Sequence, residues 1–278
     1  KAEFERGKRC YLRGRWKSCG WWYFYIYALL IKLPLGTWVL FLMACVVSAC
    51  GRKYRVSWRD EMMVLVPAVT IIATVSLQTG FTIHSRYVLP ALPFMFVWIS
   101  KISRSMTGTT RTVPLAGVTA LVWSIAASLW VFPHSISYCN ELAGGPVNGH
   151  AHLLNSNMAW GQDLLYLRTW LEQNPQARPL HLASFVFVDR TMLGVDFAVP
   201  PMGLASPDCS TDVLRAKMGP LPGWYAIDVN HLHGAEHAIP DGRGNWENPL
   251  SCDYDLTYFQ RFSPVASAGY SIHIYHIT

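Results

Sequence analysis

The chain has 278 residues, of which 51% are hydrophobic and only 14% are charged. Soluble domains carry about 25% charged residues, so this balance favours a membrane protein over an ordinary soluble domain. The net charge of +6 is unevenly distributed: residues 1–133 hold 16 basic and 4 acidic residues, whereas residues 134–278 hold 7 and 13. Because the positive half also contains the apolar runs, we expect anionic membrane lipids and no nucleic acid as partners.

The first part of the chain is basic and then aromatic. It begins at Lys1 with no methionine and no signal-like opening, so we expect a fragment of a longer protein. Residues 1–19 hold seven basic residues and are predicted as an extracytoplasmic loop. Residues 20–32 (GWWYFYIYALLIK) are typical of an interfacial aromatic belt, which we expect to bend at Pro34 into a membrane span.

Four apolar runs follow, and they predict a transmembrane region over residues 20–132. Each approaches the roughly 20 residues that cross about 30 Å of hydrocarbon as a helix. The third run contains Pro90 and Pro93. Prolines are tolerated in membrane helices because neighbouring helices can bond the backbone groups that they free. The runs are residues 33–50, 62–77, 87–102 and 113–132.

The charges of the short loops predict an orientation. Two loops that join alternate spans are basic, and the positive-inside rule makes their side cytoplasmic. The turn that carries His84 and Arg86 then faces outward, as does everything after Phe132. The basic residues 1–19 must also be outside, which conflicts with the same rule. The loop charges are Arg52, Lys53, Arg55, Arg59, Lys101, Arg104 and Arg111.

Residues 133–278 have mixed polarity and predict a small extracytoplasmic α/β domain. Residues 160–175 place Trp160, Leu164, Leu167 and Leu171 on one helical face and stop at Asn174-Pro175. Three segments alternate or run apolar like strands, and residues 211–219 read as a short helix. The strand-like segments are residues 179–188, 223–232 and 269–277.

Two chemistries find little support in the motifs. The segment HLHGAEH offers His231, His233 and His237, but their spacing is weaker than recognised zinc motifs, so we expect no metal. No G-x-S-x-G elbow occurs that would position a hydrolase nucleophile. For the cysteines two interpretations stay open: bridges joining Cys10 to Cys19 and Cys209 to Cys252, or free buried thiols.

Arg86 combines positive charge with the mouth of an apolar run, and the residues alone leave two interpretations open. It is either a snorkelling arginine that anchors a helix end to headgroups, or a guanidinium that holds a phosphate. Charge inside lipid is costly, so both interpretations place it at the membrane surface.

Several segments resemble a known protein family, and this resemblance favours the phosphate-binding interpretation of Arg86. HSRYVLPALPF, NELAGGPVNGHAHLLNSNMAWGQDLLYLRTWL and YFQRFSPVASAGYSIHIYHIT occur in order. Together they resemble the C-terminal half of bacterial membrane glycosyltransferases of the GT-C class, the glycosyltransferase family 39 of protein mannosyltransferases and aminoarabinose transferases. The resemblance implies an α-helical membrane bundle of about four transmembrane helices, followed by the α/β domain, in the bacterial inner membrane.

The resemblance also implies an activity, in which a sugar passes from a polyprenyl-phosphate carrier to a glycan, lipid or protein acceptor on the outer face, without a cofactor. Arg86, His84 and Tyr87 would then bind the carrier phosphate. Lys32, Gln162 and Asp163 are candidates to support them, although Asp163 also suits a helix N-terminus through the helix dipole.

Two departures from the family concern acidic groups. The expected catalytic acid lies in an outer loop to which nothing in this chain corresponds, so the catalytic residue is unknown and this fragment alone would be inactive. Asn155 and Ala159 stand where the family commonly has acids.

Two rival functions remain. The first is a non-enzymatic, membrane-anchored protein that binds a glycan or a partner. The second is a transporter, which would show paired broken helices about a midplane site. Pro90 and Pro93 hint at one broken helix, but no second half matches them.

Overall fold

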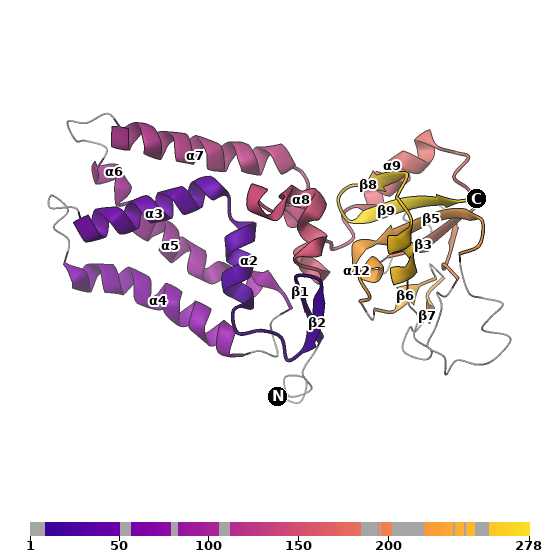
Figure 1. Cartoon of the computed structure of the whole chain (residues 1–278), viewed down its shortest axis with the longest axis horizontal. Helices are drawn as coiled ribbons and strands as arrows, with labels where there is room; N and C mark the ends of the chain where they lie inside the picture. Colours follow the sequence, from indigo (N-terminus) through magenta and orange to yellow (C-terminus); the bar gives the residue numbers. More distant parts are fainter. Residues whose placement is uncertain are drawn as a thin grey trace. The chain divides into compact units, whose positions relative to one another are not determined.

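The computed structural model of the chain (Figure 1) describes residues 9–50, 57–78, 83–105, 112–184, 194, 196–201, 220–235, 237–241, 243–247 and 256–278. Contacts divide the chain into two compact units, Lys1–Leu153 and Leu154–Thr278. Residues 133–153, which the sequence assigned to the second domain, therefore pack with the helical unit. The predicted loop charges at positions 52, 53, 55 and 111 lie outside the described residues.

The first unit is a short β-hairpin followed by helices. Its elements are β1 (Arg9–Leu12), β2 (Arg15–Ser18), α2 (Phe24–Lys32), α3 (Leu35–Cys50), α4 (Trp58–Leu77), the 3-10 helix η2 (Ser85–Ala91), α5 (Leu92–Ile99), α6 (Ile102–Ser105), α7 (Thr112–Val131), η3 (Ser135–Ser137), η4 (Glu141–Ala143), α8 (Gly145–Asn148) and η5 (Gly149–Ala151).

Two helices of the described chain, α4 and α7, are long and apolar enough to cross a membrane. The bent pair of α2 and α3 gives a third candidate span if it is counted as one. Only 11% of each long span is buried within the protein, so both present apolar side chains outward, as lipid contact requires. The predicted third span is shorter than the others, because η2 and α5 together run only from Ser85 to Ile99. Four crossings remain a prediction.

Small residues bring α3 and α7 into close contact. A Cβ atom added at Gly36 would overlap the backbone carbonyl of Ala120 on α7. The Thr37 and Ser124 hydroxyls lie 3.2 Å apart and join the same two helices by a hydrogen bond. Small residues and hydroxyl pairs of this kind let helix backbones approach where lipid supplies no hydrophobic driving force.

The break between α2 and α3 turns the chain by 110°, which confirms the predicted bend at Pro34. Asn140 from the loop after α7 closes this break. Its side-chain Nδ2 donates to the carbonyls of Leu30 (2.7 Å) and Leu33 (2.9 Å), and its backbone N–H donates to that of Ile31 (2.8 Å). These carbonyls at the end of α2 have no partners in a continuing helix, and Asn140 itself is only 1% exposed.

The second unit is a mixed sheet with helices on both faces, as Figure 1 shows. Its elements are η6 (Asn155–Asn157), α9 (Leu164–Gln173), β3 (Leu180–Ala183), β4 (Phe197–Ala198), β5 (Gly223–Asp228), α12 (Val229–Leu232), β6 (Ile239–Pro240), β7 (Trp246–Glu247), η8 (Thr257–Arg261), β8 (Ala266–Ala268) and β9 (Ile272–Ile277). The main sheet has the order β4-β3-β5-β9-β8, in which β3 is parallel to β4 and β5 while β9 is antiparallel to β5 and β8.

Alternation along β5 separates two cores. Ala226 faces the cluster built on Leu164, Leu167 and Leu171 of α9. Tyr225 and Ile227 point the other way, into a cluster that includes residues of α12 and η8. Successive side chains of a strand point to opposite faces, so one strand supplies both layers.

The α/β prediction for this unit is confirmed in outline. The three strand-like segments contain β3, β5 and β9, and the predicted helix contains α9. Trp160 is the exception, because it precedes the helix and is 53% exposed. The predicted strand over residues 223–232 ends at Asp228, and its last four residues form the helical turn α12 instead. The predicted helix 211–219 and the Cys209–Cys252 pair lie outside the described residues, and Cys10 and Cys19 are free thiols.

Replacing Asn140 with alanine tests the closure of the break. The change removes both Nδ2 bonds. The Leu30 carbonyl keeps the Trp38 indole N–H at 3.2 Å as a donor, whereas the Leu33 carbonyl loses its side-chain donor. We expect the free energy of unfolding to fall by about 1–3 kcal/mol, because a buried polar group that loses its partner keeps its desolvation penalty. The readout is the thermal unfolding midpoint of the detergent-solubilised chain. The control is Asn148→Ala, which removes an exposed bond to the Gly144 carbonyl. Equal midpoints for the two variants would contradict this role of Asn140.

Candidate functional site

The turn that carries Arg86 is a 3-10 helix at one end of the helical unit. η2 follows the α4 span and leads directly into α5 through Pro90 and Pro93. Its three-residue period buries Val88 and Ala91, which are 1% and 0% exposed. Arg86 and Leu89 occupy another face of the same helix and are exposed. The prolines therefore start a new helix here and leave Arg86 on its outer face.

The three residues predicted to bind phosphate lie together in this turn. The Arg86 guanidinium carbon lies 5.5 Å from the centre of the Tyr87 ring, a cation–π distance. The His84 and Tyr87 rings meet edge to face with centres 5.8 Å apart. The Tyr87 N–H donates to the His84 carbonyl (3.4 Å) and closes the turn. One short segment thus gathers a guanidinium, an imidazole and a phenol.

α2 packs against η2 and supports it from the protein side. Tyr25 of α2 is fully buried and lies close enough to Tyr87 for their hydroxyls to interact electrostatically. Tyr87 thus has the buried Tyr25 nearby and the exposed Arg86 guanidinium over its ring. A guanidinium fixed over a ring presents a planar fork of N–H donors, the geometry that matches the oxygens of a phosphate.

Lys32 lies at the other end of α2, beside the break. Its Nζ donates to the Ile136 carbonyl at 2.9 Å and interacts with the Cys139 thiol. Burial raises the pKa of Cys139, and the nearby Lys32 ammonium opposes that rise. These contacts make Lys32 part of the junction between α2 and the loop after α7, and its support of the Arg86 turn stays a prediction.

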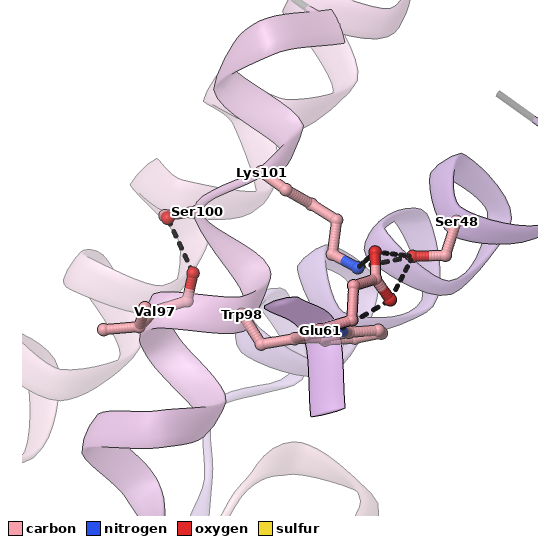
Figure 2. A network of polar contacts seen from close by, with 6 residues as sticks. All are labelled: Ser48, Glu61, Val97, Trp98, Ser100 and Lys101. Carbon is pink, nitrogen blue, oxygen red and sulfur yellow. Dashed lines mark hydrogen bonds and ion pairs between the residues drawn. The ribbon is translucent and has the colours of Figure 1, made fainter. Parts of the chain in front are cut away.

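A second charged group of the helical unit lies where α3, α4 and α5 come together (Figure 2). Lys101 Nζ forms a 2.9 Å ion pair with Glu61, and both side chains are largely buried, at 5% and 18% exposure. Ser48 donates to the same carboxylate at 3.2 Å and accepts a hydrogen bond from Lys101. The Trp98 indole N–H donates to Glu61 at 3.4 Å, and Lys101 Nζ lies 3.6 Å from the centre of the Trp98 ring.

The buried position of Lys101 differs from the sequence-based prediction. The sequence read it as one of the solvated loop charges that orient the bundle, whereas the structure buries it among three helices. Glu61 was the available clue, because it is an acidic residue at the start of an apolar span, and such residues usually have a partner. Sequence periodicity alone does not say which cation reaches it.

Gln162 and Asp163 lie in the second unit and have structural contacts there. Gln162 accepts from the Trp160 N–H (2.6 Å) and donates to the Met158 carbonyl (3.2 Å), which closes the turn before α9. The buried Asp163 carboxylate accepts from the Tyr270 and Ser271 N–H groups and from the Ser271 hydroxyl at 2.7–3.0 Å. Its side chain makes no capping bond to α9, so it holds the turn before β9 instead of acting through the helix dipole alone.

A polar network continues beyond the carboxyl end of β5. Asp228 accepts two hydrogen bonds from Asn230, and burial raises the pKa of Asp228 to about 7. Asn230 accepts from the Asn155 N–H (2.5 Å), and Asn155 accepts from His237 (2.8 Å). Burial lowers the pKa of His237 to about 4, so the ring is neutral at pH 7. Asn155 thus serves as a neutral link between Asn230 and His237.

The histidine segment does not form a metal centre within the described residues. His231 Nε2 donates to the Ser184 carbonyl at 3.1 Å, and its ring centre lies 6.5 Å from that of His237. No group of three or more His, Cys, Asp or Glu side chains in the described ranges is arranged to hold an ion.

Comparison with models of protein families, with curated proteins and with solved structures finds no match.

Replacing Lys101 with methionine tests the buried ion pair. The change leaves the Glu61 carboxylate without its cation. We expect the free energy of unfolding to fall by about 3 kcal/mol, which lowers the thermal unfolding midpoint by roughly 5–10 °C. Combining Lys101→Met with Glu61→Met removes both charges and should recover most of that loss, because an apolar pair carries no unpaired charge.

The control for this cycle is Arg59→Met, an exposed cation near the start of the same α4 helix, which should shift the midpoint by no more than about 1 °C. If Lys101→Met behaves like Arg59→Met, the ion pair does not hold the helices together.

Proposed function

We propose that this chain is the C-terminal part of a membrane glycosyltransferase that uses a polyprenyl-phosphate-linked sugar, and that Arg86 binds the carrier phosphate. The single observation that supports this is the gathering of Arg86, His84 and Tyr87 in one exposed turn at the end of an apolar helical unit. A lipid-borne phosphate would meet the protein at that level, with its chain beside apolar helices and its charge at the surface.

The chemistry assigns Arg86 a role in the reaction. An acceptor hydroxyl attacks the anomeric carbon of the sugar, the bond from that carbon to the carrier phosphate breaks, and the phosphate oxygen keeps the electron pair. Negative charge on the phosphate therefore increases in the transition state, and a cation fixed beside it accelerates the step. The proton of the acceptor passes to a general base, which we do not assign to any residue of this chain.

The Tyr87 ring fixes the Arg86 guanidinium, and His84 supplies a further hydrogen-bond donor. This arrangement favours a fixed ligand over loose headgroup anchoring, because a stacked guanidinium loses less conformational freedom when it binds a phosphate. The proposed site needs no metal and no organic cofactor.

Arg86→Ala tests the proposal through binding of undecaprenyl phosphate to the chain in phosphatidylcholine nanodiscs. Loss of a charge-assisted bidentate contact should weaken binding by about 2–3 kcal/mol, or roughly 30- to 150-fold. Arg86→Lys should keep part of the affinity, since an ammonium lacks the planar fork.

Arg59→Ala is the matched control, because Arg59 is also exposed and stacks on the ring of its neighbour Trp58 at 5.9 Å. The Arg59→Ala variant should bind undecaprenyl phosphate with the same affinity as the unmodified chain. Equal binding by Arg86→Ala and the unmodified chain would reduce Arg86 to a membrane anchor and favour the non-enzymatic alternative.

A further inference from the structure

The hairpin β1–β2 and α2 carry basic and apolar side chains on adjoining exposed surfaces. Residues 9–32 contain no aspartate or glutamate. The hairpin exposes four cations, and the chain from Trp22 through α2 exposes four large apolar or aromatic side chains. The cations are Arg9, Arg13, Arg15 and Lys17. The others are Trp22 (65% exposed), Tyr23 (37%), Ile26 (50%) and Leu30 (43%).

The first strand of the hairpin, β1, is buried against the helical unit. Cys10, Tyr11 and Leu12 are at most 3% exposed. The Arg13 N–H donates to the His152 carbonyl (3.1 Å), and the Tyr27 hydroxyl of α2 bonds the His152 ring (2.5 Å). The turn of the hairpin and α2 therefore both contact His152, so their exposed residues belong to one surface.

Aromatic rings line up with the cations on this surface. Arg9 lies 5.4 Å from the Trp16 ring centre, Arg13 lies 5.8 Å from that of Tyr27, and Lys17 lies 5.9 Å from that of Trp21. Such pairs combine a charged head with an aromatic ring, the combination that suits the headgroup level of a bilayer, where Trp and Tyr are enriched.

The direction of α2 places its apolar stripe at the same level. Ile26 and Leu30 lie one helical turn apart on α2, and the exposed Trp22 lies in the turn just before the helix. Because α2 turns by 110° from α3, it lies close to the membrane plane when α3 runs across the membrane. An apolar stripe parallel to the plane enters the boundary between headgroups and acyl chains, while neighbouring cations meet lipid phosphates.

From these observations we propose that β1, β2 and the exposed face of α2 form a docking surface for the anionic headgroups of the surrounding bilayer. The occupant is the phosphate of bulk anionic phospholipid, and the carrier phosphate belongs to the Arg86 turn. This surface does not depend on the proposed glycosyl transfer. Each Lys or Arg close to an anionic membrane strengthens the attraction roughly fivefold at moderate salt.

Hydrogen exchange of the whole chain in nanodiscs tests this surface. Amides of residues 9–19 are compared in pure phosphatidylcholine and in phosphatidylcholine with phosphatidylglycerol. We expect exchange to be slower by about tenfold or more with the anionic lipid. High salt should weaken this protection, because it screens the attraction between the cations and the lipid phosphates. Equal exchange in the two membranes would overturn the proposal without the need for any variant.

Two triple variants identify the side chains responsible. Arg9→Gln, Arg15→Gln and Lys17→Gln together should abolish the difference between the two membranes. Arg178→Gln, Arg243→Gln and Arg261→Gln remove three exposed cations from the second unit and should leave it unchanged. A difference that persists in the first triple variant would also overturn the proposal.

Undecaprenyl phosphate added to phosphatidylcholine nanodiscs separates this surface from the Arg86 turn. It should protect residues 83–91 and leave residues 9–19 unaffected. Protection of residues 9–19 by the carrier but not by phosphatidylglycerol would overturn the docking surface, whereas failure to protect residues 83–91 would count against the proposed function alone.

Discussion

The geometry of the helical unit depends on satisfying the backbone carbonyls at the break between α2 and α3. A helix that stops within or beside a membrane leaves polar groups that lipid does not hydrogen-bond. Asn140 supplies three donor contacts to this end of α2 from the loop after α7. The contacts tie the loop after α7 to α2, and α2 in turn packs against the turn that carries Arg86. A single buried amide thus connects the ends of three segments.

The two ends of the bundle each carry a cation, one buried and one exposed. Where α3, α4 and α5 meet, the cation Lys101 is paired with Glu61 and buried, so its charge is neutralised among the helices. At the end with η2, Arg86 stays exposed and stacks on Tyr87. The Lys101 cation is therefore shielded inside the bundle, whereas the Arg86 side chain is accessible at its surface.

Sequence periodicity predicted the elements better than it predicted their polar contacts. Helix and strand patterns located α4, α7, α9 and the strands β3, β5 and β9, because apolar spacing directly reflects which faces are buried. The roles of Asn140, Lys101 and Asp163 were missed, since each depends on a partner between about 40 and 110 residues away in the chain. The clustering of His84, Arg86 and Tyr87 was predictable because it is local, whereas their ligand rests on resemblance.

The outward placement of the Arg86 turn is tested by labelling a cysteine at position 86 with a membrane-impermeant reagent. The labelling uses intact cells and a variant without other reactive cysteines. A cysteine at Ser103, which is exposed near the other end of the bundle, is the matched position. We expect position 86 to be labelled from outside and position 103 to be labelled only after the membrane is permeabilised. Labelling in the reverse order, or equal protection of both positions in a membrane that is intact, would contradict this placement.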